Sequence, residues 1–191
     1  NLSEVIGSAE KELFTVTEKK LSSDFLKVDQ LLANSFEELQ ELSQKQGKLA
    51  GIPSGFKDVD SLFNGFRGGD LIILAARPGV GKTSFALNLA VNAAKLGTTV
   101  AFMSLEMGAN QLIQRILCTE AQLNLSKVRS GHIAGAEWSQ IVNASASLGE
   151  LELYIDDTPG ISVAEIRAKC RKLKLEKDLS EKELNAVLKI L

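Results

Sequence analysis

The sequence contains few aromatic residues, two cysteines and one histidine, and it has no long apolar run. Aromatic residues make up 5% of the 191 residues, so aliphatic side chains must fill any core. The hydrophobic fraction of 45% is typical of a globular protein and excludes a wholly disordered chain. Because no apolar run approaches the roughly 18 residues of a membrane span, we expect no transmembrane helix and no membrane partner.

The cysteines and the charge balance bound the classes of site. Cys118 and Cys170 lie far apart and outside the spacings of metal ligands, so we expect two reduced thiols rather than a disulfide or a zinc site. The net charge of -2 announces no strongly basic face for nucleic acid, although a local patch stays open. No signal peptide opens the chain at Asn1, and we expect a cytoplasmic protein that was processed or is a piece of a longer one.

Three segments differ in character. Residues 1–48 are polar and helical, residues 49–173 alternate apolar strands with helices, and residues 174–191 read as an amphipathic helical tail. A capping box at residues 180–183 opens the helix of the tail. The middle segment is long enough for the main domain, so we expect function to lie there.

A short helix is predicted near the end of the first segment, at residues 35–45. Ser35 and Glu38 form a capping box at its start, and Gly47 is placed to end it. Phe36, with leucines three and six residues later, leaves a narrow apolar edge that must dock to be stable. Docking on the chain's own main domain and docking on a neighbouring subunit are equally compatible with the pattern.

The middle segment predicts an α/β fold. Strands are expected at residues 70–75, 98–103 and 151–155, and helices at residues 83–96, 110–123, 137–148 and 163–173. The strands are continuous apolar runs, as in a sheet covered on both faces. Strands that alternate with helices imply right-handed crossovers and a parallel sheet with flanking helices.

A glycine-rich turn at residues 76–83, Ala-Arg-Pro-Gly-Val-Gly-Lys-Thr, separates the first predicted strand from the first predicted helix. This is the context of a phosphate-binding P-loop, in which backbone amides and a helix N-terminus surround phosphate oxygens. Gly79 and Gly81 permit backbone angles that a side chain would block. Lys82 is placed to bridge two phosphates and Thr83 to ligate Mg²⁺. The usual pattern opens with glycine where this chain has alanine, but the strand and helix around the turn make the motif specific.

Acidic residues follow the other two predicted strands, where α/β sites gather. Glu106 follows the second strand, and Asp156 and Asp157 follow the third. A strand ending in two acids resembles a magnesium-binding motif, yet the sequence Asp-Thr-Pro-Gly is also turn chemistry. Spacing alone leaves the metal and the turn interpretations of the aspartate pair open.

Other polar and aromatic residues receive ordinary structural interpretations. His132 is expected in a solvated loop rather than in a catalytic role. Trp138 is expected on the core face of its helix. Arg115 and residues 127–129 could contact phosphate or a neighbouring subunit, but a solvated face is favoured for them.

Several motifs, in order, resemble the RecA-type motor domain of the DnaB family of bacterial replicative helicases. They are Gly-Ile-Pro-Ser-Gly-Phe at 51–56, Asp-Val-Asp at 58–60, residues 68–78, Gly-Lys-Thr at 81–83, Ser-Leu-Glu-Met at 104–107 and residues 154–160. The resemblance covers residues 49–173 densely, and residues 35–45 match the family's linker helix more loosely. It implies a RecA-like P-loop fold that is incomplete on its C-terminal side.

The resemblance also implies a site. Nucleotide would contact Arg77, Pro78, Gly79, Val80, Gly81, Lys82, Thr83 and Ser84. Lys82 and Glu106 would be catalytic, with Glu106 as the base that activates water, and Thr83 would bind Mg²⁺ beside ATP. The aspartate pair corresponds to a family element that precedes the Walker B strand, which favours the turn interpretation for it.

Partners follow from the same resemblance. Family members form six-subunit rings on single-stranded DNA with ATP sites between subunits, so residues 35–45 are expected to dock on an adjacent copy. Primase and a helicase loader are further expected partners. The family continues after residue 173 into a Walker B strand, DNA-binding loops and an arginine finger, none of which residues 174–191 match. The chain is therefore expected to be a fragment that binds ATP, with a non-motor nucleotide-binding or interaction module as the alternative.

Overall fold

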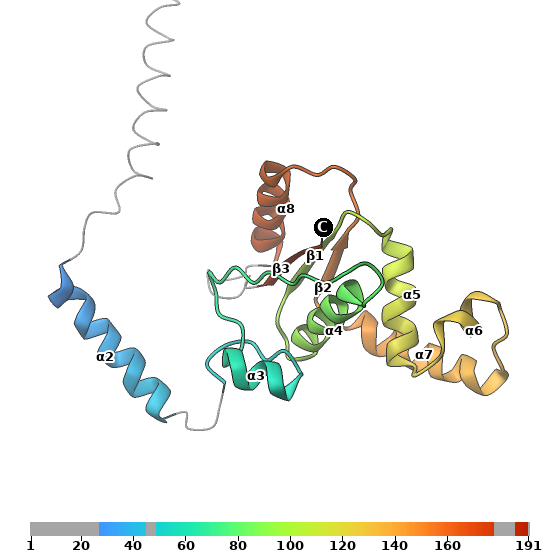
Figure 1. The fold of residues 1–191 in the computed structure, drawn as a ribbon, viewed down its shortest axis with the longest axis horizontal. Coiled ribbons are helices and arrows are strands. Elements are labelled where there is room, and N and C mark those ends of the chain that lie inside the picture. The colour runs from blue at the N-terminus through green and yellow to red at the C-terminus, as the bar shows by residue number, and fades with distance from the viewer. Residues whose placement is uncertain (1–26, 45–48, 178–185, 191) are drawn as a thin grey trace, which may run out of the picture. The chain divides into compact units, whose positions relative to one another are not determined.

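The computed structural model describes residues 27–44, 49–177 and 186–190. The chain divides into two units, residues 1–48 and 49–191, whose arrangement relative to one another is not defined (Figure 1). No helix among the described residues is long and apolar enough to cross a membrane.

The described part of the first unit is one helix, α2 (Val28–Gln44). It begins seven residues before Ser35, so the predicted capping box at its start is wrong, and Ser35 lies inside the helix. The physical reason is upstream: Val28 and Leu31 extend the apolar repeat by two turns, and the helix propagates through the serine. Gly47, which is predicted to end this helix, lies outside the described residues.

The second unit is built on a parallel sheet of β1 (Val100–Ser104), β2 (Leu153–Asp156) and β3 (Ala186–Ile190). Their order is β2-β1-β3, with Val100 opposite Leu153 on one side and Ala186 on the other. All five residues of β1 are buried, as the continuous apolar run predicts for a central strand.

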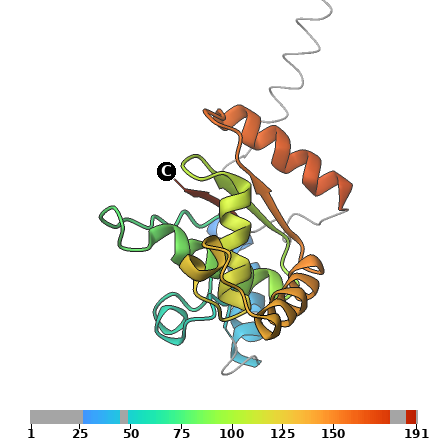
Figure 2. The same cartoon turned by 90° about the vertical axis from the view of Figure 1, so that its right-hand side faces the viewer.

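Helices cover both faces of this sheet (Figures 1 and 2). In chain order they are α3 (Lys57–Phe63), α4 (Lys82–Lys95), α5 (Ala109–Glu120), α6 (Leu125–Arg129), α7 (Gly135–Gly149) and α8 (Val163–Glu176). Val100 and Phe102 pack with the apolar faces of α4 and α5, whereas Ala101 and Met103 pack with α8. Because side chains alternate along β1, the two faces carry separate clusters and the unit has three layers. The predicted α/β fold is confirmed.

The strand predicted at residues 70–75 is wrong. These residues belong to no helix or strand, and Leu71 and Ile73 are 86% and 81% exposed. A strand needs a hydrogen-bonded neighbour, and both edges of β1 are already occupied by β2 and β3. The apolar run is therefore correct as a composition signal but has no pairing partner beside β1.

The helical tail predicted for residues 174–191 is also wrong in its last part. Helix α8 continues to Glu176, but residues 186–190 form β3, a parallel partner of β1. The predicted capping box at residues 180–183 lies outside the described residues. The run of apolar residues near the end of the chain satisfies strand pairing as well as a helical stripe, and the free edge of β1 decides between them.

Candidate functional site

The segment before the P-loop is fastened to α4. Ile52 and Phe66 exchange backbone hydrogen bonds of 2.8 and 2.9 Å, which closes the segment into a loop around α3. Asn92 on α4 donates to the carbonyl of the buried Ser54 at 2.9 Å. The ring of Phe56 packs on Phe85 of α4 with a centroid distance of 4.9 Å. The P-loop helix is therefore held on its outer side by residues that lie far upstream of the P-loop.

The P-loop runs through exposed residues into the first turn of α4. Gly79 and Gly81 have φ angles of +80° and +108°, which L side chains rarely adopt. The amide of Val80 donates to the carbonyl of Arg77 at 3.3 Å, and Phe85 donates to Gly81 at 2.9 Å. The two glycines thus turn the chain sharply before the helix starts at Lys82, as the motif predicts.

The first turn of α4 is suited to an anion. Its N-cap is Gly81, and no side chain among the described residues caps it. Early amides of a helix and its dipole then face solvent with a partial positive charge. No atom lies within 4 Å of the place where a side chain on Gly79 or Gly81 would begin, so the loop is open on that side. These features fit a bound nucleotide phosphate, with Lys82, Thr83 and Ser84 on the turn that would face it.

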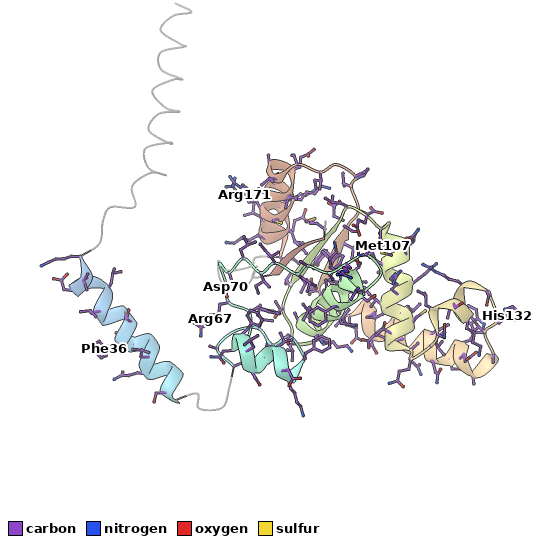
Figure 3. All side chains as sticks on the ribbon, in the orientation of Figure 1. Phe36, Arg67, Asp70, Met107, His132 and Arg171 are labelled. Atoms are coloured by element: carbon purple, nitrogen blue, oxygen red, sulfur yellow. The ribbon has the colours of Figure 1, made fainter. Side chains whose placement is uncertain are left out.

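Glu106 lies at the same edge of the sheet as the P-loop. Helix α4 leads through a short turn into β1, so the N-terminus of α4 and the carboxyl end of β1 come to the same edge. Glu106 is exposed in the loop that follows β1, next to Met107 (Figure 3). Helix α5, which begins after this loop, packs on α4 through the shared core cluster. The two parts of the predicted site therefore share one edge, although they lie on different loops.

The loop that carries Glu106 is fixed by neighbouring groups. The buried Ser104 hydroxyl donates to the carbonyl of Met107 at 2.8 Å and accepts from its amide at 3.2 Å. The Met107 side chain packs against the main core cluster. Beyond the loop, a carboxylate oxygen of Asp157 accepts from the amide of Ala109 at 2.8 Å.

Asp156 takes part in a different network. It accepts from Lys169 of α8 and from the amide of Thr158 at 2.9 Å, and Lys169 also donates to the Thr158 hydroxyl at 2.8 Å. The hydrogen bonds from Lys169 and then from Thr158 lower the pKa of Asp156 from 3.8 to about 2. No group of three or more potential metal ligands occurs within the described parts of the chain. The pair thus serves the turn after β2 and two neighbouring helices, in agreement with the turn interpretation.

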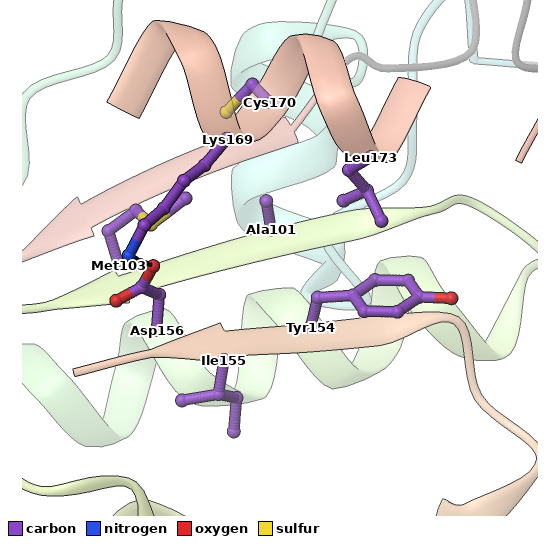
Figure 4. Close-up of a pocket in the computed structure, with 8 residues that line it drawn as sticks. All are labelled: Ala101, Met103, Tyr154, Ile155, Asp156, Lys169, Cys170 and Leu173. Atoms are coloured by element: carbon purple, nitrogen blue, oxygen red, sulfur yellow. Dashed lines mark hydrogen bonds and ion pairs between the residues drawn. The ribbon is translucent and has the colours of Figure 1, made fainter. Parts of the chain in front are cut away.

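The Lys169–Asp156 pair borders a shallow hollow between the sheet and α8 (Figure 4). Its lining is mostly apolar, with Ala101, Met103, Cys170 and Leu173 among the residues that form it. The hollow lies on the α8 face of the sheet, whereas α4 covers the other face. It is therefore separate from the P-loop.

Arg115 departs from its predicted solvated position. Its Nη1 atom lies 3.5 Å from the Ser84 hydroxyl on α4, and its Nε atom is buried without a partner among the described residues. A guanidinium beside the first turn of α4 adds positive charge behind the P-loop. Sequence reasoning missed this contact because 31 residues separate the two positions and only the packing of α5 on α4 brings them together.

The remaining singled-out residues divide between confirmed and wrong predictions. His132 is an exposed loop residue whose Nδ1 lies 3.0 Å from the Ser130 hydroxyl, as expected (Figure 3). Lys127 pairs with Glu137 at 2.5 Å on the surface. Trp138 is 55% exposed, so its predicted place on the core face is wrong. It sits four residues after the N-cap of α7, where the helix has not yet reached the core residue Ala144.

Cys118 and Cys170 are both free and buried. Burial raises the pKa of each thiol, because a thiolate is poorly solvated away from water. Such thiols are unreactive and pack as small apolar groups. The prediction of unpaired thiols is confirmed.

Comparison with known proteins agrees with the site. A family model described as the DnaB-like helicase C terminal domain matches residues 51–184. The chain is 45% identical over 177 residues to the replicative DNA helicase DnaC of Bacillus subtilis, which covers 92% of this chain and 39% of that protein. It is 42% identical over 176 residues to the replicative DNA helicase DnaB of Geobacillus stearothermophilus, again covering 92% and 39%. The chain thus spans about two fifths of the length of these relatives.

Solved structures give the same result. The structure of an isolated ATPase domain matches 80% of this chain and 54% of its own with a TM-score of 0.74 and 31% sequence identity. A DnaB-like replicative helicase, studied for its interactions with primase, matches 87% of this chain and 40% of its own with a TM-score of 0.71 and 29% identity. The family match at residues 51–184 includes the P-loop and the loop after β1. The chain belongs to the DnaB-like helicase C-terminal domain family.

Proposed function

We propose that these residues form part of an ATP-driven replicative DNA helicase and supply the nucleotide-binding side of its ATP site. The observation that supports this most is the open first turn of α4, entered through Gly79 and Gly81 at positive φ. The relatives named as replicative DNA helicases support the same activity. A cytoplasmic location, where bacterial DNA is replicated, belongs to this proposal.

ATP and Mg²⁺ are the proposed cofactors. Residues 77–81 surround the phosphates with backbone amides, Lys82 pairs with phosphate oxygens, and the Thr83 hydroxyl is the Mg²⁺ ligand. Ser84 contributes its amide and keeps its hydroxyl toward Arg115, 3.5 Å away. When bound, the metal ion neutralises charge on the phosphates.

Glu106 is the proposed general base. Its carboxylate is exposed at the carboxyl edge of β1, so it can accept a proton from a water molecule beside the phosphates. The loop around it is fixed by the Ser104 hydroxyl, which restricts where that carboxylate can point. A positioned base is worth more than a mobile one, because the water must be aligned with the phosphorus atom.

Self-assembly through α2 is the proposed mode of association. Its exposed apolar residues are Val28, Leu31, Leu32, Phe36 and Leu39. They recur at helical spacing along α2 and form a stripe that a monomer leaves in water. In the second unit, Trp138 and Val142 are exposed on one face of α7, and Ile113 is exposed on α5. We assign the α2 stripe of one copy to this α5–α7 surface of the next copy in a ring of six.

Single-stranded DNA is the proposed track, held inside that ring. Primase and a helicase loader are proposed protein partners, the first because a DnaB-like relative of this fold was studied with primase. The formal charge of -2 means that DNA contact would depend on local basic groups rather than on the whole surface.

A steady-state ATPase assay combined with mass measurement tests this proposal. With ATP and Mg²⁺, the protein should assemble beyond a monomer and hydrolyse ATP faster when single-stranded DNA is added. Glu106→Gln should lower turnover by about a hundredfold or more while assembly persists. Asp58→Asn, a change of an exposed acid on α3, serves as the matched control and should leave turnover unchanged.

Nucleotide binding with no turnover in the unaltered chain would instead favour a nucleotide-binding interaction module. Equal turnover in the unaltered protein and Glu106→Gln would contradict the role of this residue. A monomer at every nucleotide and protein concentration would contradict the ring.

A further inference from the structure

The loop between β1 and α5 is fixed at three places around one exposed carboxylate. Upstream of Glu106, the Ser104 hydroxyl bridges the Met107 carbonyl and amide at 2.8 and 3.2 Å. Within the loop, Met107 packs its side chain on the core. Downstream, Asp157 accepts from the Ala109 amide at 2.8 Å, and this contact spans 48 residues of sequence.

Asp157 supplies a cap that the helix itself lacks. The N-cap of α5 is Gly108, which has no side chain to accept a hydrogen bond from the first amides. A carboxylate from the end of β2 takes that place, and its negative charge is favourable at a helix N-terminus. Since Gly108 is the last residue of the Glu106 loop, this cap fixes the end of the loop.

The backbone that carries Asp157 is fixed in turn. Asp156 before it is paired with Lys169 of α8, and Thr158 after it donates its amide to Asp156 at 2.9 Å. Lys169 also donates to the Thr158 hydroxyl at 2.8 Å. The connection therefore runs from α8 through the turn after β2 to the start of α5. A rigid support of this kind limits how far the carboxylate of Asp157 can move with the loop.

We propose that Asp157 is a positioning residue for hydrolysis: its cap on α5 fixes the loop that aims Glu106. This inference rests on the proposed role of Glu106 as the base. Asp157 acts through an oxygen that accepts from an amide, so its charge is secondary and an asparagine can replace it. Loss of the cap lets the loop move, and small displacements of a catalytic group reduce turnover without reducing ground-state binding.

Asp157→Ala and Asp157→Asn separate this role from a general structural one. Asp157→Ala should lower the kcat for ATP by about tenfold with an unchanged KM, and Asp157→Asn should stay within about twofold of the unaltered protein. Asp58→Ala is the matched control, because Asp58 is also an acid in the first turn of a helix, α3, away from this loop. Thermal unfolding of each variant shows whether the fold persists.

Amide hydrogen exchange gives a reading that needs no turnover. Exchange at Ala109 and Met107 should quicken by about tenfold in Asp157→Ala and stay slow in Asp157→Asn and Asp58→Ala. Unchanged exchange at both amides in Asp157→Ala, or a kcat in Asp157→Asn as low as in Asp157→Ala, would overturn the proposal. If Glu106→Gln hydrolyses ATP normally, the proposed base falls, whereas the exchange result still decides whether Asp157 fixes the loop.

Discussion

Asn92 of α4 donates a hydrogen bond of 2.9 Å to the backbone carbonyl of Ser54, and this contact ties the helix after the P-loop to a loop 38 residues upstream. Ser54 is 1% exposed, so its carbonyl has no alternative partner in water. Gly55 follows at a φ of +79°, and a side chain there would begin 2.2 Å from the Asn92 amide nitrogen. The two positions are therefore coupled through both a hydrogen bond and a steric limit.

This coupling predicts a pattern of stabilities. Asn92→Ala should lower the free energy of unfolding by about 1 kcal/mol, because the buried carbonyl loses its donor. Gly55→Ala should cost about 2 kcal/mol or more through its positive φ and the clash. Urea unfolding of both single variants and the double variant measures the coupling. The double variant should lose less than the sum, since the clash disappears with the Asn92 side chain; strict additivity would contradict the coupling, and Asn143→Ala on exposed α7 is the control.

The ion pair between Lys169 and Asp156 predicts an acid dependence. The pKa of Asp156 is lowered to about 2 from 3.8, so its contribution to stability is fully present above pH 4 and is lost as the pH falls through about 2. Carboxyl NMR titration should show this low pKa in the unaltered protein and a pKa nearer 3.8 in Lys169→Met. A pKa near 3.8 in both proteins would show that the pair does not form in solution. Lys172→Met, on the same helix, controls for the loss of a charge.

The two buried thiols predict slow chemical modification. Burial raises the pKa of Cys118 and of Cys170, so few thiolates are present at neutral pH and access is poor. Iodoacetamide should modify both at least about tenfold more slowly in native protein than in urea, as followed by mass spectrometry. Fast labelling of either residue under native conditions would contradict its burial.

The exposed tryptophan predicts a fluorescence signal for self-association. Trp138 is the single tryptophan of the chain and lies on the α5–α7 surface assigned to the α2 stripe of another copy. Its emission should shift to shorter wavelength as concentration rises with ATP and Mg²⁺, because assembly removes it from water. Phe36→Glu should raise the concentration needed by about tenfold or more, and Val163→Glu, an exposed apolar residue of α8, should not. A concentration-independent spectrum would place the association surface elsewhere.

The sequence predicts the helices of the core because their apolar residues recur at helical spacing on long, regular segments. Strands are harder to predict, since a short apolar run does not identify its partner. Residues 70–75 have the composition of a strand and remain unpaired, whereas residues 186–190 have a helical pattern and pair with β1. Competition for the edge of β1 is a property of the whole chain, and no local pattern contains it.

The site shows the same division. The P-loop and Glu106 are recognisable because their chemistry depends on neighbours in sequence. Contacts that support them are long-range, such as Asp157 with Ala109 and Arg115 with Ser84. A glycine at the N-cap of α5 is the one local signal for the first, since a helix start without a capping side chain needs an oxygen from another segment.

Calorimetric titration of ATP with Mg²⁺ into the protein tests the central claim most directly. We predict saturable binding of one nucleotide per chain, weakened by about tenfold or more in Lys82→Ala because a charged hydrogen bond to phosphate is lost. Glu106→Gln should bind as the unaltered protein does, since a base acts on water rather than on the bound ground state. Equal affinity in the unaltered protein and in Lys82→Ala, or no binding at all, would contradict the account.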